Sequence, residues 1–121
     1  MRLSLLYGAS LDQAEARGDA AIAVERIRGP LMLVSGEDDQ MWPSTRMADA
    51  IVARLTAHGR SFEYSHFSYA GAGHFSGPPS FNAHVGGGSF DLGGAAEANA
   101  AARNDSWPRV IDFLRRSLAS G

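Results

Sequence analysis

The 121-residue chain contains no cysteine and no lysine. The lack of cysteine excludes disulfides, thiolate nucleophiles and zinc sites with cysteine ligands. Because all eleven basic residues are arginine, a Schiff base or a lysine general base is excluded as well. No apolar run approaches the roughly 20 residues that a membrane helix needs, and the apolar stretch at residues 3–7 is short for a secretory signal. We therefore expect a cytoplasmic protein that does not insert into membranes.

The chain also lacks a concentration of charge of one sign. Eleven basic and thirteen acidic residues give a formal net charge of −2, and 45% of the residues are hydrophobic. This composition is typical of a globular domain rather than a disordered chain. Since nucleic-acid binding normally needs a concentrated basic face, no nucleic-acid partner is expected.

Two stretches with strand character flank a helical pattern. Residues 31–34 are continuously apolar between Gly29-Pro30 and an acidic turn, which is typical of a strand buried on both faces of a sheet. An apolar stripe predicts a helix over residues 44–58, with Ser44 as its N-cap. Residues 62–69 are rich in aromatic side chains and predict a second strand. A helical crossover between two strands indicates a parallel sheet, and therefore an α/β fold.

The remaining segments have weaker patterns. Residues 11–17 and 22–27 have some helical character, and residues 75–94 form a long loop rich in glycine and proline. An alanine-rich stretch at 95–102 weakly favours a helix. A final helix is predicted to begin at Asp105 or Ser106, with Pro108 in its first turn, where its missing N–H is tolerated.

Acidic residues and a histidine follow the two predicted strands. Ligands of open parallel sheets bind beyond the carboxyl ends of the strands. Asp38 and Asp39 follow the first strand and His74 follows the second. If the strands are neighbours, a carboxylate can orient the imidazole and leave its other nitrogen as a general base. The alternatives are a solvated acidic turn and a surface histidine.

Several segments, taken together and in order, resemble one known family. They are IAVERIRGP (22–30), LMLVSGEDDQMWPS (31–44), ARLTAHG (53–59), YAGAGHFSGPP (69–79) and DSWPRVIDFLRRSL (105–118). Over residues 22–118 the chain is similar to the C-terminal catalytic region of the acyl-CoA thioesterase / bile-acid-CoA:amino-acid N-acyltransferase family, within the α/β-hydrolase fold. The resemblance implies a catalytic order of nucleophile, acid and histidine. It places the acid at Asp39, with Asp38 as the alternative, and the base at His74.

The nucleophile of that family is missing from the sequence. The elbow G-x-[SC]-x-G should precede the acid. Residues 8–12 lack its second glycine, Ser35 lies in the turn of the acid, and Ser76 follows the histidine. We therefore expect residues 1–121 to form a single, incomplete α/β-hydrolase domain, a fragment that is nearly inactive by itself because loss of the nucleophile costs on the order of 10⁶ in kcat.

The resemblance implies that the complete enzyme acts on an acyl-CoA or acyl ester through an acyl-enzyme intermediate. The partner that we expect is either a second chain carrying the upstream half, or a second copy of this chain that associates through an exposed sheet edge. The alternative is a non-catalytic fragment, or a binding or regulatory module that pairs with another chain.

No cofactor and no metal are expected. The four histidines, His58, His66, His74 and His84, are spaced by 8, 8 and 10 residues, unlike the i, i+3 or i, i+4 pairs of helical metal sites. Three consecutive glycines at 86–88 match no phosphate-binding loop.

Overall fold

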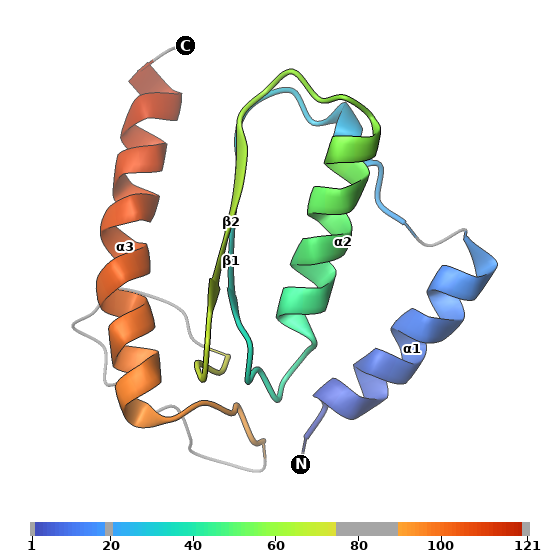
Figure 1. Ribbon diagram of the computed structural model, residues 1–121, viewed down its shortest axis with the longest axis vertical. Helices are drawn as coiled ribbons and strands as arrows, with labels where there is room; N and C mark the ends of the chain where they lie inside the picture. Colours follow the sequence, from blue (N-terminus) through green and yellow to red (C-terminus); the bar gives the residue numbers. More distant parts are fainter. Residues whose placement is uncertain (1, 19–20, 75–89, 120–121) are drawn as a thin grey trace.

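A computed structural model describes residues 2–18, 21–74 and 90–119 of the chain. The described elements, in order, are α1 (Ser4–Arg17), a 3-10 turn η1 (Val24–Arg26), β1 (Leu31–Gly36), α2 (Ser44–Ala57), β2 (Tyr64–Tyr69) and α3 (Ala96–Ala119). The two strands form a central layer between α3 on one face and α2 on the other, and α1 lies beyond α2 (Figure 1).

β1 and β2 pair in parallel, in a register that runs from Leu31 opposite Tyr64 to Gly36 opposite Tyr69. A parallel pair needs a long crossover connection, and α2 provides it. The α/β class and the adjacency of the two strands, both predicted from the sequence, are therefore confirmed. With two parallel strands and three α-helices, the structure is compatible with part of a larger α/β domain.

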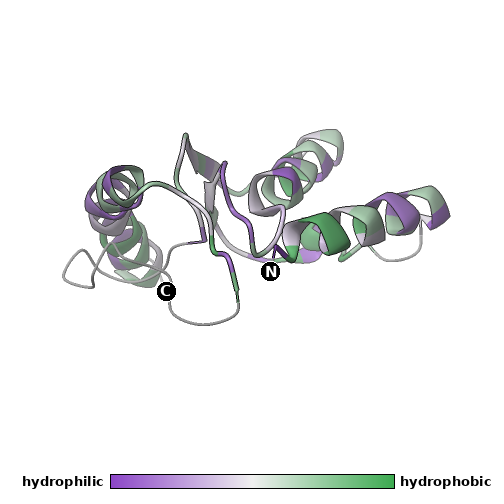
Figure 2. Cartoon of the chain, turned by 90° about the horizontal axis from the view of Figure 1, so that it is seen from below, coloured by the Kyte–Doolittle hydropathy of each residue, from purple (hydrophilic) through white to green (hydrophobic). Residues whose placement is uncertain are grey.

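Few large side chains are fully buried. Leu55 of α2 has no exposed surface, whereas Val34 in β1 is 36% exposed. The prediction that residues 31–34 are buried on both faces is therefore wrong within this chain, because a sheet of two strands leaves its outer edges uncovered. The helices carry both hydrophobic and hydrophilic residues, as Figure 2 shows.

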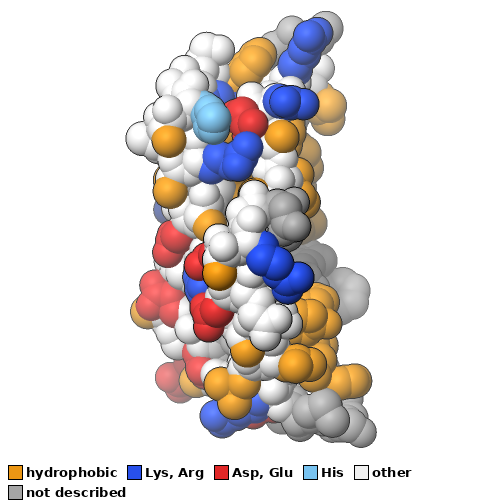
Figure 3. Space-filling model, turned by 90° about the vertical axis from the view of Figure 1, so that its right-hand side faces the viewer, with side chains coloured by type: hydrophobic (Ala, Val, Ile, Leu, Met, Phe, Trp, Pro, Cys, Tyr) orange, Lys and Arg blue, Asp and Glu red, His pale blue; other side chains and the backbone are white. Residues whose placement is uncertain are grey.

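α1 is longer than the helical stretch predicted at residues 11–17. It runs from Ser4 to Arg17, and Gly18 follows it as the C-cap, with a φ of +70° and an N–H bond to the carbonyl of Ala14. Leu5 and Leu6 remain exposed, and hydrophobic side chains lie at the surface of this side of the molecule (Figure 3). Within the described residues, no helix is both long and apolar enough to cross a membrane.

The start of α2 also differs from the prediction. No side chain caps the helix, and Ser44 is its first residue rather than its N-cap. The Ser44 and Thr45 hydroxyls instead donate to the carbonyl of Gly36, at 3.3 and 3.2 Å. The first turn of α2 is thus tied to the end of β1.

The prediction that a new helix begins at Asp105 or Ser106 is wrong. α3 is continuous, and Pro108 lies in its interior rather than in a first turn. A proline in a helix interior costs about 3 kcal/mol relative to alanine, so other contacts must keep this helix continuous at Pro108.

Contacts with β2 on both sides of Pro108 provide that support. The Tyr69 hydroxyl donates to Asp105 at 2.7 Å, and the Arg109 guanidinium lies 4.8 Å from the centre of the Phe67 ring. Burial, together with the bond to Asp105, raises the pKa of Tyr69 to about 12. Asp105 therefore joins α3 to the sheet and does not cap a helix.

Candidate active site

The acidic turn after β1 holds one carboxylate in a fixed, buried position. The Asp39 side chain is 3% exposed. Its Oδ1 accepts hydrogen bonds from the backbone N–H groups of Met41 and Trp42, at 2.8 and 3.1 Å. These bonds satisfy one oxygen inside the turn, so Oδ2 is left to face the neighbouring loop.

His74, in the loop after β2, occupies that position. Its Nδ1 lies 3.0 Å from Asp39 Oδ2, in hydrogen-bonding geometry. Since Nδ1 faces a carboxylate, the neutral ring carries its proton there and leaves Nε2 as the basic nitrogen. The side chain is 34% exposed, and its ring meets the Trp42 ring edge-on at a centroid distance of 5.5 Å. The structure thus brings together the two residues that the sequence singled out.

Backbone contacts fix the loop of the histidine. The N–H of His74 donates to the carbonyl of Leu92 at 2.7 Å, and the N–H of Gly73 donates to Asn99 Oδ1 at 2.8 Å. Asn99 is 3% exposed near the start of α3. No role was predicted for Asn99 from the sequence, where its one signal is a polar side chain of modest helix propensity within an alanine-rich stretch.

Glycines allow the turn after β1, the loop after β2 and the segment before α3 to lie in close contact. A Cβ added at Gly36 would lie 2.4 Å from the carbonyl oxygen of Ala72, and one added at Gly73 would lie 2.2 Å from that of Gly93. Contacts this short do not occur between real side chains and backbone, so the backbones approach this closely only because both positions are glycine.

Asp38, the alternative acid, has other partners. Its Oδ2 accepts the N–H of Gly94 at 2.9 Å, and its Oδ1 accepts the Gln40 amide at 2.7 Å. It joins the acidic turn to the segment before α3. Of the two carboxylates, the one in hydrogen-bonding contact with the imidazole is Asp39.

Comparison with known proteins decides the family. The family model described as BAAT / Acyl-CoA thioester hydrolase C terminal matches residues 5–120. The chain belongs to this family. The match is wider than the similarity over residues 22–118 found from the sequence, and it includes α1.

The curated relatives that the chain matches include both acyl-CoA thioesterases and N-acyltransferases. The peroxisomal succinyl-coenzyme A thioesterase of Mus musculus is 29% identical over 133 residues, covering 98% of this chain and 31% of the relative. The mitochondrial acyl-coenzyme A thioesterase 2 of Mus musculus is 34% identical, covering 82% and 23%. The bile acid-CoA:amino acid N-acyltransferase of Homo sapiens is 30% identical, covering 78% and 23%. The chain thus spans about a third or less of the length of these relatives.

A second set of hydroxyl, imidazole and carboxylate groups lies between β1, β2 and α2. The Ser35 hydroxyl is 2.7 Å from His66 Nε2, and His66 Nδ1 is 3.2 Å from Asp49 Oδ1. Ser35 is 4% exposed and its hydroxyl is also 2.9 Å from that of Thr45. Because the hydroxyl is covered by α2, it has no access to a substrate, and the set stabilises the helix–sheet contact instead.

The other histidines form no metal centre in the ranges that the structure describes. No group of three or more potential ligands occurs there. His58 lies at the C-terminal end of α2, as predicted. His66 lies in β2, within the strand predicted over residues 62–69, whereas His84 is outside the described residues.

Proposed function

We propose that this chain supplies the acid and the general base of an acyl-CoA thioesterase or acyltransferase of its family, with Asp39 orienting His74. One observation carries the proposal: a buried carboxylate and a partly exposed imidazole approach to 3.0 Å at the carboxyl ends of two parallel strands. The family supports acyl-CoA as the class of substrate.

In this reaction His74 Nε2 takes the proton of a serine or cysteine nucleophile as that group attacks the thioester carbonyl. The carbon–sulfur bond breaks, the acyl group passes to the nucleophile, and the imidazolium returns the proton to the leaving thiolate. His74 then takes a proton from water or an amine, which attacks the acyl-enzyme. The bond between the acyl group and the nucleophile breaks, the acyl product leaves, and the imidazolium returns the proton to the nucleophile. Asp39 stabilises the imidazolium in both steps, because its charge lies at Nδ1.

The nucleophile in this proposal comes from residues outside the printed sequence. We propose that the chain contributes its two strands to an α/β-hydrolase sheet as a single, partial domain. The outer edge of β1, which pairs with no strand in the described ranges, provides backbone groups to which further strands can be added. The cytoplasmic location expected from the sequence stays a prediction.

The test measures thiol release from a panel of acyl-CoA thioesters. The chain is assayed alone and after co-expression with a second polypeptide that carries an upstream half with a G-x-[SC]-x-G elbow. We expect little activity from the chain alone and acyl-CoA cleavage from the pair. His58→Gln is the matched control, since His58 lies at the end of α2 away from the acidic turn.

The alternative function is a non-catalytic module, and the missing elbow is the observation that favours it. If the pair assembles and cleaves no thioester, or if cleavage is the same after His74→Gln, the chain is such a module and the catalytic proposal is wrong.

A further inference from the structure

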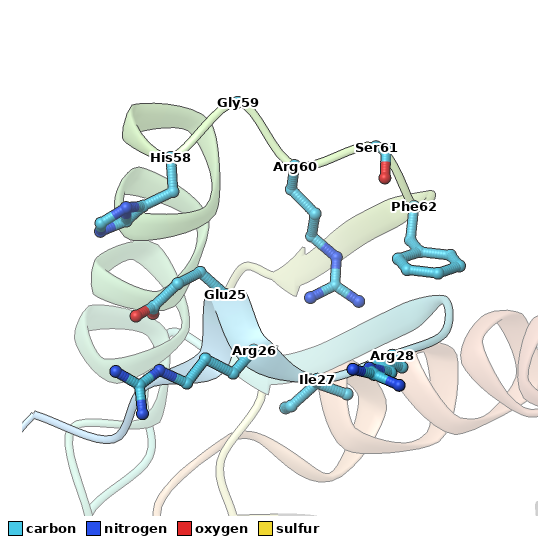
Figure 4. Close-up of a pocket in the computed structure, with 9 residues that line it drawn as sticks. All are labelled: Glu25, Arg26, Ile27, Arg28, His58, Gly59, Arg60, Ser61 and Phe62. Carbon is cyan, nitrogen blue, oxygen red and sulfur yellow. The ribbon is translucent and has the colours of Figure 1, made fainter.

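A basic hollow lies at the opposite end of the sheet from Asp39 and His74. It has a volume of about 510 Å³, between residues 25–28, which lead into β1, and residues 58–62, which lead into β2 (Figure 4). The strands have six residues each, so about 20 Å of sheet separates this hollow from the acid–histidine pair. It is therefore a separate site.

The side chains around the basic hollow leave an excess of positive charge. Arg26, Arg28 and Arg60 line it, and Glu25 is the acidic group among the lining residues. Glu25 is already paired with Arg54, at 2.5 and 2.9 Å. The hydrogen bonds from Arg54 lower the pKa of Glu25 to about 2, so it stays ionised and its charge is neutralised by a residue outside the lining.

One of the three guanidinium groups is held in place. Arg60 donates to the carbonyls of Val24 and Gly29, and it lies 5.4 Å from the centre of the Phe62 ring. Its Nε is buried and has no hydrogen-bond partner in the described part of the chain. Figure 4 shows this guanidinium pointing from the α2–β2 loop toward residues 25–28. Because its Nη groups bond the backbone and its Nε is buried, Arg60 contributes a fixed positive charge to the hollow rather than a free donor.

The other two guanidinium groups belong to surface residues. Arg26 and Arg28 are exposed, and within the described ranges neither forms an ion pair. Ile27 and Phe62, at 43% and 45% exposure, add apolar surface to the same hollow. The hollow thus combines two exposed cations, a fixed cation and an apolar surface.

We propose that the basic hollow binds a diphosphate group, free or as part of a nucleotide. Arginine presents a planar fork of donors that matches phosphate oxygens. Arg26 and Arg28 offer two exposed forks for a ligand with two phosphates, and Arg60 adds a fixed positive charge. The volume is within the range of small-molecule sites, and the exposed Phe62 ring offers a surface for a nucleotide base.

The test is a calorimetric titration of the chain with pyrophosphate at low salt. The variant is Arg26→Gln/Arg28→Gln, which leaves the Arg60 contacts in place. The control is Arg17→Gln/Arg115→Gln, which lowers the net charge equally on α1 and α3. We expect the variant to bind about tenfold more weakly and the control to bind like the unmodified chain. Absence of binding, or an equal loss in both double variants, would overturn the proposal.

A competition experiment then distinguishes a free diphosphate ligand from a nucleotide that contains a diphosphate group. Displacement of pyrophosphate by ADP or coenzyme A, lost in Arg26→Gln/Arg28→Gln, assigns a nucleotide ligand to the hollow. No displacement by either assigns free diphosphate. The measurement is of binding and not of thioester cleavage, so its failure leaves the catalytic proposal untouched.

Discussion

Two carboxylate–imidazole pairs occur among the described residues, and their burial is reversed. In the first, the Asp39 side chain is 3% exposed and that of His74 is 34% exposed. In the second, the Asp49 side chain is 67% exposed and that of His66 is 10% exposed. Catalysis by a general base needs a fixed carboxylate and an accessible ring nitrogen. The first pair, with its buried carboxylate and partly exposed ring, is therefore the better candidate for the proposed acid and base.

The two histidines also differ in the contacts of their other ring nitrogen, Nε2. His66 Nε2 is bonded to the Ser35 hydroxyl inside the protein. In the described residues, His74 forms its side-chain hydrogen bond through Nδ1, which leaves Nε2 for a reacting group. Residue types alone do not distinguish the two pairs, whereas their burial supports the proposed catalytic role of the first and a structural role of the second.

The largest expected effect is on activity. In the co-expressed pair, His74→Gln should lower kcat by at least about 10⁴-fold, because no base then remains for the nucleophile. His66→Gln, measured in parallel on the same acyl-CoA, should change kcat by less than about tenfold. Comparable losses in both variants would contradict the assignment drawn from their burial.

Ser35→Ala should destabilise the chain. It leaves His66 Nε2 without its partner at a nearly buried position, which costs about 1–3 kcal/mol of unfolding free energy. Ser68→Ala is the matched control, since Ser68 is opposite Ser35 in the register but its hydroxyl bond to Glu37 is exposed. Urea denaturation followed by circular dichroism measures both. A cost for Ser68→Ala as large as that for Ser35→Ala would show that the buried bond contributes nothing.

Asp39→Ala should cost about 1 kcal/mol of stability beyond its effect on activity, because two backbone N–H groups of the acidic turn lose their acceptor. Asp39→Asn keeps an acceptor oxygen for these groups and should be nearly as stable as the unmodified chain, while still impairing catalysis. Urea denaturation of the two variants, compared with thiol release by the co-expressed pair, separates the two roles. Equal stability of both variants would mean that the turn does not depend on Asp39.

The smallest effect is expected for Asp49→Asn. Because this carboxylate is largely exposed, its contact with His66 is screened by water, and the unfolding free energy should change by less than about 0.5 kcal/mol. The same urea experiment measures it. A loss as large as that of Ser35→Ala would show that the carboxylate is needed to hold the ring.

The sequence predicted the proximity of Asp39 and His74 for a simple reason. Both residues follow strands, and a helix between two adjacent strands makes those strands parallel, so their carboxyl ends meet at one edge. Which of the two aspartates contacts the ring depends on the path of the turn, and the family resemblance supplied that choice rather than the spacing.

Other features depend on tertiary contacts that no local pattern contains. The Ser35–His66 bond needs the strand register, and the buried Asn99 needs α3 to pack under the histidine loop. Local rules were also overridden at Pro108, where proline predicts a helix start and contacts with β2 keep the helix intact. Here packing outweighed propensity.

The close crossing of Gly36, Gly73 and Gly94 has a consequence for how this site can vary. At each of these positions an added Cβ would lie within 2.4 Å of a backbone or side-chain atom of another loop. The distance between the Asp39 carboxylate and the His74 ring therefore depends on backbone segments that pack together with no side chain between them. Replacing any of these three glycines with alanine would force the loops apart. The contact between Asp39 and His74 can therefore be lost through a change at a residue that takes no part in proton transfer.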